Sequence, residues 1–197
     1  MLWIALGVAA LFVVLLVVVI GLYNGLVRKR VDCDNAWSQI DVQLKRRHDL
    51  IPNLVETVKG YAGHERGTLE AVIAARNQAV TVAGSAGSPA GAPGAVAERA
   101  AAEGALSSAL GRLFALSEAY PDLKANTNFA QLQEELTSTE NKVGFSRQHY
   151  NDCVGRYEET RQTFPTAIIA GVFNFGPREY FTVDVAEQRE APKVSFK

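Results

Sequence analysis

NFAQLQEELTSTENKVGFSRQHYNDCVGRYEETRQTF, residues 128–164, is the stretch that decides the fold class. Its apolar and small side chains recur at alternating intervals of three and four residues, which is a heptad pattern held for about five repeats. These residues are Phe129, Leu132, Leu136, Thr139, Val143, Ser146, Tyr150, Cys153, Tyr157, Thr160 and Phe164. The pattern predicts one helix of about 50 Å, because each residue rises about 1.5 Å. Asn128 and Gln131 predict a capping box at its start, and Pro165 is expected to end it.

Three further helices are expected between this stretch and the N-terminal region. The first, from about Asp32 to Tyr61, keeps its apolar phase through Pro52, so we predict one long helix with a kink at that proline. The second is expected at about Thr68–Val82 and the third at about residues 95–119. Residues 84–94, GSAGSPAGAPG, are expected to form a loop between the second and the third.

The N-terminal region predicts an uncleaved transmembrane helix. Leu2–Leu22 is 21 residues long and contains no charge and no proline, which is enough to span the roughly 30 Å apolar core of a bilayer. A secretory signal would need a positive n-region and a shorter apolar run. Basic residues follow at 28–30 and 45–47, so the positive-inside rule places Met1 outside and the rest of the chain in the cytoplasm.

Composition excludes several classes of function. The 197-residue chain has 20 Lys and Arg against 21 Asp and Glu, without the basic excess of a nucleic-acid-binding protein. Its two cysteines fit a compartment where disulfides are not relied upon. Its histidines, at positions 48, 64 and 149, do not converge with other reactive groups, and Thr68 stands where a zinc-protease helix needs its second histidine. We therefore expect no enzymatic activity, no catalytic residues, no metal ligands and no cofactor.

Charged residues flank the apolar stripes of the first and last predicted helices. In an up-down-up-down bundle, setting Phe164 level with Arg30 places Arg147 level with Arg47. Asp49–Arg147 and Arg47–Glu140 are then the expected pairs of a structural polar layer, which would fix the register of the helices. The alternative is that these charged groups extend to the surface. The residues of the predicted layer are Arg47, Asp49, Glu140 and Arg147.

The same register has a consequence for the two cysteines. It places Cys153 near residue 41, about 12 Å along the axis from Cys33. A disulfide requires Cα atoms within about 7 Å, so no bond between the two is expected.

The tail, residues 166–197, loses the helical period after about Gly171 but keeps many aromatic residues. Four helical crossings would return it to the membrane side of the bundle. Aromatic and basic residues suit the headgroup region, so we expect residues 166–181 close to the bilayer, with packing along the tail's own bundle as the alternative. The candidate contacts with the membrane or a neighbouring subunit are Phe173, Phe175, Tyr180 and Phe181.

The sequence resembles the LemA family of bacterial membrane-anchored helical proteins. The motifs that carry the resemblance are YNGLVRKR at 23–30, the segment 36–65 around RRHDLIPNLVETVKGYAGHE, residues 128–165, and APKVSF at 191–196. The chain departs from the family pattern at RYEE, 156–159, and in the 84–94 loop. The resemblance implies a helical antiparallel bundle on one anchor in the bacterial inner membrane, without an assigned activity or cofactor. It also implies relatives associated with internal membrane compartments or encoded near membrane-bound proteases.

Together these observations predict an all-α protein. A single N-terminal transmembrane helix (1–23) is followed by an elongated antiparallel four-helix bundle with long first and last helices (24–165) and an extended C-terminal tail (166–197). The expected partners are the lipid bilayer, further copies of the chain and a membrane protein, but not nucleic acid. The functional hypotheses are a self-associating scaffold that organises or remodels the bilayer, and an adaptor that presents partners to a membrane protease or transporter. A ligand-sensing bundle is a third, weaker hypothesis.

Overall fold

A computed structural model describes residues 1–62, 64–85 and 94–182. All regular secondary structure in these ranges is helical, which confirms the all-α prediction. The helices are α1 (Leu2–Lys59), α2 (Arg66–Ser85), α3 (Ala95–Ser117), α4 (Pro121–Lys124), α5 (Thr127–Gln162) and α6 (Thr166–Val172). Most of the predicted 84–94 loop, the last fifteen residues of the tail and the APKVSF motif lie outside the described residues.

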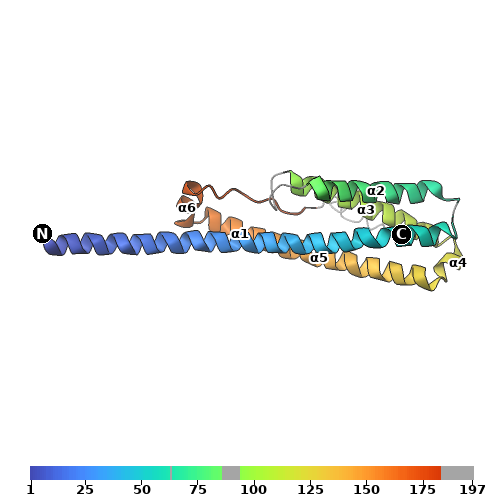
Figure 1. Cartoon of the computed structure of the whole chain (residues 1–197), viewed down its shortest axis with the longest axis horizontal. Helices are drawn as coiled ribbons and strands as arrows, with labels where there is room; N and C mark the ends of the chain where they lie inside the picture. Colours follow the sequence, from blue (N-terminus) through green and yellow to red (C-terminus); the bar gives the residue numbers. More distant parts are fainter. Residues whose placement is uncertain (63, 86–93, 183–197) are drawn as a thin grey trace, which may run out of the picture.

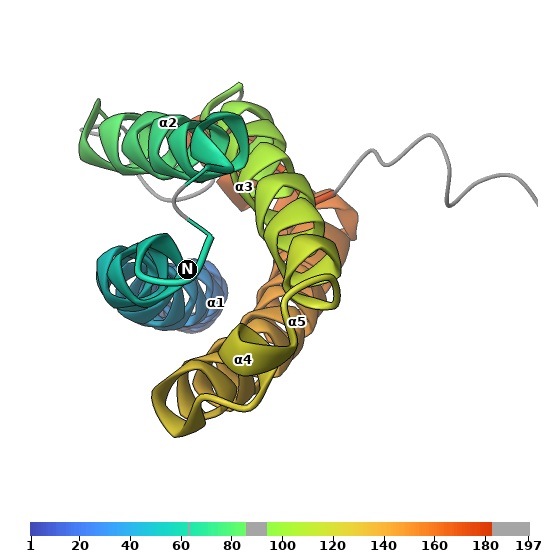
Figure 2. The same cartoon turned by 90° about the vertical axis from the view of Figure 1, so that its right-hand side faces the viewer.

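The long helices run back and forth along a common axis (Figure 1). α2 returns beside the far part of α1, α3 runs forward again, and α5 returns along α1 to α6. Viewed along this axis, α2, α3 and α5 form an arc that partly surrounds α1 (Figure 2). The most extensive helix–helix contacts are those of α1 with α5 and of α2 with α3.

α1 joins the apolar N-terminal region and the first bundle helix in one 58-residue helix. Residues 1–21 are all exposed, and the first buried side chain is that of Leu26. Figure 1 accordingly shows the first part of α1 standing alone. Within the described residues, α1 is the one helix long and apolar enough to cross a membrane. The helix continues from the apolar part because residues 23–31 contain no proline, and the one glycine there, Gly25, costs only about 1 kcal/mol in a helix.

Pro52 lies inside α1, as the sequence predicted. A proline has no N–H, so the carbonyl four residues earlier, that of His48, lacks its helical donor. Arg76 of α2 supplies the missing bond, because its Nε donates to the His48 carbonyl oxygen at 3.0 Å. The prediction of one helix through Pro52 is confirmed, and the kink at that residue stays a prediction.

α5 follows the predicted heptad stripe, but it starts two residues earlier than the capping box implied. The Asn126 side chain is the N-cap and accepts a hydrogen bond from the Phe129 backbone N–H at 3.0 Å. The expected cap at Asn128 is therefore wrong. Most of the stripe is buried, but its last residue, Phe164, lies beyond the end of α5 and is 78% exposed.

The register of α5 against α1 differs from the predicted one by two helical turns. The rings of Trp37 and Tyr150 lie 5.2 Å apart, and Glu140, not Arg147, stands level with Arg47. The prediction assumed that the last helix ends level with Arg30. In the structure it extends further toward the apolar part of α1, because its end and α6 pack down to Leu22 and Tyr23.

The corrected register also changes the reasoning about the cysteines. The pairing of Trp37 with Tyr150 places Cys153 level with Asp34, beside Cys33 in one core cluster. The predicted 12 Å separation along the axis is therefore wrong. Both residues are nevertheless free thiols in the structure, and both are buried.

Candidate functional site

Buried charges meet where the apolar core is divided in two. In one core cluster the buried α1 residues lie within Leu26–Leu44, and in the other they begin at Ile51. Between them lies a group contributed by three helices, which we call the buried polar layer. Its residues are Arg47 and His48 of α1, Glu103 and Ser107 of α3, and Glu140 of α5.

Glu103 is the centre of the buried polar layer. It is fully buried, and its Oε1 lies 2.8 Å from Nε2 of His48. Its Oε2 accepts a longer hydrogen bond, 3.5 Å, from Nη1 of Arg47. A buried carboxylate is tolerated only when it is paired and hydrogen-bonded, and Arg47 and His48 together meet this requirement.

Arg47 joins α1 to both other helices. Its Nη2 donates to the Ser107 hydroxyl at 2.8 Å, and its Nη1 lies 3.1 Å from Oε2 of Glu140, the ion pair expected from the sequence. The Arg47 side chain is 4% exposed and that of Glu140 is 44% exposed. A cavity of about 280 Å³ between α3 and α5 opens onto this pair, with Leu110, Phe114 and Leu136 among its lining residues.

The expected Asp49–Arg147 pair is wrong. Asp49 faces solvent and pairs with Lys45 at 3.4 Å, because the corrected register moves Arg147 two turns away from it. Arg147 is partly buried, and its guanidinium carbon lies 4.7 Å from the centre of the Phe181 ring. Burial lowers its pKa, and Glu140 opposes that change.

A second set of polar side chains on α5 holds the segment 173–182. Tyr157 donates its hydroxyl to the Gly176 carbonyl at 2.8 Å, and Tyr150 donates to the Glu179 carbonyl at 2.9 Å. Asn151 accepts from the Phe181 N–H at 2.8 Å and donates to the Phe181 carbonyl at 3.1 Å. We call these residues, with Glu158, the tail clamp. Because it bonds mostly to the backbone, the clamp fixes the path of the segment.

Glu158 completes the tail clamp. Its Oε1 accepts the Arg178 backbone N–H at 2.9 Å, while its Oε2 accepts from Arg161 and Gln162. Burial on its own would raise the pKa of Glu158, but these hydrogen bonds outweigh it and the pKa is lowered. The Arg178 guanidinium reaches across to Asp34 of α1 at 2.6 Å, so the segment bridges α5 and α1.

The four candidate contacts in the tail divide into two pairs. Phe175 and Phe181 are buried in the protein's own core, so they are not available to a membrane or subunit. Phe173 and Tyr180 are half exposed. Residues 174–182 therefore pack back along the bundle, which is the alternative weighed from the sequence.

Two buried charges, Arg99 and Glu103, were missed by sequence reasoning. Both lie on α3. Arg99 pairs with Asp41 at 2.6 Å and lies over the Trp37 ring. The signal was present, because positions 99 and 103 continue the three-and-four spacing of Leu106, Leu110 and Leu113 toward the N-terminus.

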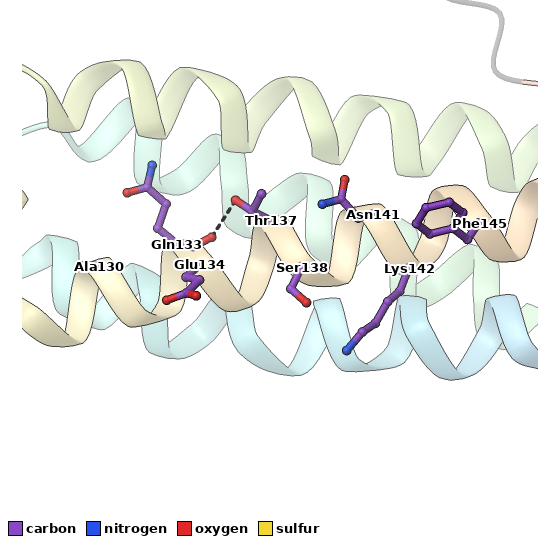
Figure 3. A pocket seen from close by; sticks show the side chains of 8 residues that line it. All are labelled: Ala130, Gln133, Glu134, Thr137, Ser138, Asn141, Lys142 and Phe145. Carbon is purple, nitrogen blue, oxygen red and sulfur yellow. Dashed lines mark hydrogen bonds between the residues drawn. The ribbon is translucent and has the colours of Figure 1, made fainter.

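The described residues bring together no group of three potential metal ligands among His, Cys, Asp and Glu. Burial raises the pKa of the Cys33 thiol to about 11, so it is a poor nucleophile at neutral pH. A shallow strip runs along the outer face of α5 from Ala130 to Phe145 (Figure 3). There the Thr137 hydroxyl donates a hydrogen bond to the Gln133 carbonyl of its own helix. This strip suits contact with another surface better than a reaction.

Comparison with known proteins gives a family and several relatives. The model of the LemA family matches residues 36–196. Magnetosome protein MamQ of Magnetospirillum gryphiswaldense is 25% identical over 174 residues, which cover 81% of this chain and 64% of MamQ. Protein LemA of Metamycoplasma hominis is 25% identical over 180 residues, which cover 87% of this chain and 78% of that protein.

Two MamQ proteins of Paramagnetospirillum magneticum match at the same identity and coverage as the first MamQ. The chain thus spans less than two thirds of the length of the MamQ relatives. None of these names states an enzymatic reaction.

Proposed function

The chain belongs to the LemA family, and from that premise we propose that it is a membrane-anchored helical scaffold that self-associates and organises or remodels the bilayer. Family membership and the likeness to MamQ and LemA proteins support a membrane-associated helical protein. We also propose that the chain acts through partners and self-association and not through catalysis. The four-helix bundle is the proposed unit of assembly.

The observation that carries the proposal is the continuity of α1. Its apolar residues 2–22, which are exposed up to residue 21, match the thickness of a bilayer, and the same helix then forms one side of the packed domain. A span joined to its domain without a flexible linker fixes the position and orientation of that domain relative to the span. This is what a scaffold requires if copies are to meet in register.

The proposed topology is single-pass in the bacterial inner membrane, with Met1 outside and the helical domain in the cytoplasm. Arg28, Lys29 and Arg30 support it, because this basic cluster begins within two turns of the end of the apolar segment, and basic residues next to a span favour the cytoplasmic side. Alkylation of a cysteine placed at Val42, which is 63% exposed, tests it in whole cells. A membrane-impermeant maleimide should label the Val42→Cys variant only after the cells are opened.

Self-association is tested with the full-length chain in mild detergent and in lipid nanodiscs. Light scattering after size exclusion should give a mass larger than one chain, and this mass should fall on dilution. Vesicles carrying the protein should differ in shape or clustering from empty vesicles in cryo-electron micrographs. A monomer at every concentration, with unchanged vesicles, would contradict the scaffold proposal.

An adaptor is the second candidate, favoured by the outer face of α5. Phe145 is 72% exposed there, beside Lys142, Asn141 and Ser138 on the strip shown in Figure 3. A photo-crosslinking residue at position 145 should capture copies of the chain if the scaffold proposal holds. One recurrent foreign membrane protein would favour the adaptor instead. The matched control is the same residue at exposed Gln78 on α2.

A further inference from the structure

α6 is apolar on both sides, although only one side faces the protein. Ile169 and Ala170 are buried against the bundle, while Ile168 and Val172 are 57% and 73% exposed. Positions 168 and 172 lie one turn apart on the same face of the helix. Phe164, 78% exposed, lies just before α6, and Phe173, 50% exposed, directly follows it. We call these four residues the α6 apolar face.

The α6 apolar face lies at the level where α1 leaves its apolar segment. The Tyr23 ring contacts the Phe173 ring edge-on at 4.9 Å and the Phe175 ring at 5.6 Å. Tyr23 is the first residue after the 21-residue apolar stretch. Figure 1 shows α6 beside α1, next to the part of α1 that stands alone.

The distribution of charge around α6 matches the boundary of a bilayer. Residues 163–177 contain no Asp, Glu, Lys or Arg. The nearest basic cluster along α1, residues 28–30, begins about 8 Å beyond Tyr23, since each residue rises about 1.5 Å. Arg178, the next charge after α6, is turned toward Asp34 of α1. Apolar and aromatic side chains thus lie at one level, and cationic groups lie a short distance further out, where lipid phosphates would be.

We propose that α6 is a second membrane contact, in which Phe164, Ile168, Val172 and Phe173 enter the boundary between lipid headgroups and acyl chains beside the span of α1. The inference rests on the proposed membrane anchoring, since the level of α6 is measured from the end of the span. Lipid is the occupant because the surface next to an isolated span at this level is acyl chain, and an uncharged apolar face of four residues suits it. The sequence predicted that residues 166–181 lie near the bilayer and named Phe173, Phe175, Tyr180 and Phe181 as contacts. The fold buries Phe175 and Phe181 and leaves Ile168 and Val172 exposed.

Site-directed spin labelling of the full-length chain tests this. Cys33→Ala with Cys153→Ala gives a background for single cysteines at Ile168, Val42 and Val14, after circular dichroism confirms unchanged helicity. All three side chains are more than half exposed. Val14 lies inside the apolar segment, and Val42 lies on α1 about 29 Å beyond Tyr23. The protein is placed in vesicles of zwitterionic and anionic phospholipid, and the accessibility of each nitroxide to oxygen and to a water-soluble nickel complex is measured.

The expected ratio of oxygen to nickel accessibility is high at Val14, low at Val42, and several-fold higher at Ile168 than at Val42. A ratio at Ile168 equal to that at Val42, with Val14 still in lipid, would overturn the proposal for α6 alone. A water-like ratio at Val14 would instead remove the proposed anchoring. If Ile168 is shielded from both reagents and its spectrum is broadened by a second label, a second copy covers this face and lipid does not. A label at Val172 repeats the measurement and should give the same order.

Discussion

Replacing Glu103 with leucine should lower the free energy of unfolding by about 3–5 kcal/mol, because it removes one member of a buried ionic group and leaves the others behind. The structure shows why the loss should be large. Arg47, with a side chain 4% exposed, and His48, with a side chain 6% exposed, both lie against the Glu103 carboxylate. Once that carboxylate is gone, Nε2 of His48 has no other hydrogen-bond partner among the residues that the structure describes, and Arg47 keeps Ser107 and the half-exposed Glu140.

The matched control is Glu135→Leu. Glu135 lies 3.9 Å from Arg46, the neighbour of Arg47, but both side chains are about half exposed. An exposed pair of this kind contributes about 0–1 kcal/mol. Urea unfolding of the full chain in detergent micelles can be followed by the fluorescence of Trp37, which packs on Tyr150, in a background where Trp3 is replaced by phenylalanine.

The double variant Arg47→Met with Glu103→Leu should lose clearly less stability than the sum of the two single losses. This follows because each single change strands the partner that the other removes. The reasoning is refuted if Glu103→Leu costs no more than Glu135→Leu, or if the two losses at 47 and 103 add within about half a kcal/mol.

Three further predictions follow from other contacts. Arg76→Met should lower the free energy of unfolding by about 1–2 kcal/mol, because the hydrogen bond to the His48 carbonyl is lost. In a Pro52→Ala background the loss should be clearly smaller, because the new N–H of residue 52 can donate to that carbonyl. Equal losses in the two backgrounds, measured by urea unfolding, would show that the two sites are independent. The tail clamp should be sensitive to acid: the pKa of Glu158 is lowered, so its contribution to stability is complete above its ordinary value of 4.5 and is lost as the pH falls through the lowered pKa. Glu158→Gln should flatten that part of the pH–stability curve, and an unchanged curve would count against the clamp. Cys33 is buried, with a pKa raised to about 11, so it should resist iodoacetamide at pH 8 until urea unfolds the chain. Mass spectrometry detects the alkylated cysteine, and rapid alkylation of the folded protein would contradict this burial.

The periodicity of apolar residues was enough to predict most of the helices. The heptad stripe of residues 129–157 and the unbroken phase through Pro52 predicted α5 and the far part of α1, because helical spacing is a local property of the sequence. The register between them could not be obtained in the same way. Every heptad offers the same apolar stripe to the facing helix, so shifting α5 by seven residues leaves the pattern of apolar contacts nearly unchanged.

What distinguishes one register from the next is the partner of each charge. Arg47 and Glu140 were paired correctly, since both flank long apolar stripes. The partner that completes the group, Glu103, stands on α3 among alanines, and its position in space depends on a loop whose length says nothing about register. The tail posed a similar difficulty, because the bonds of Tyr150, Asn151 and Tyr157 to its backbone leave no trace in the tail's own sequence.

The uninterrupted α1 makes the protein a lever whose short arm is the membrane span. The 37 residues from Tyr23 to Lys59 form an arm of about 55 Å at about 1.5 Å per residue. Membrane spans tilt by about 20° on average, and the tilt changes with the thickness of the bilayer. A change of about 10° in that tilt swings the far end of α1 sideways by about 10 Å, and α2, α3 and α5 move with it. A small difference in lipid thickness is thereby converted into a displacement comparable to the width of a helix, at a height well outside the bilayer.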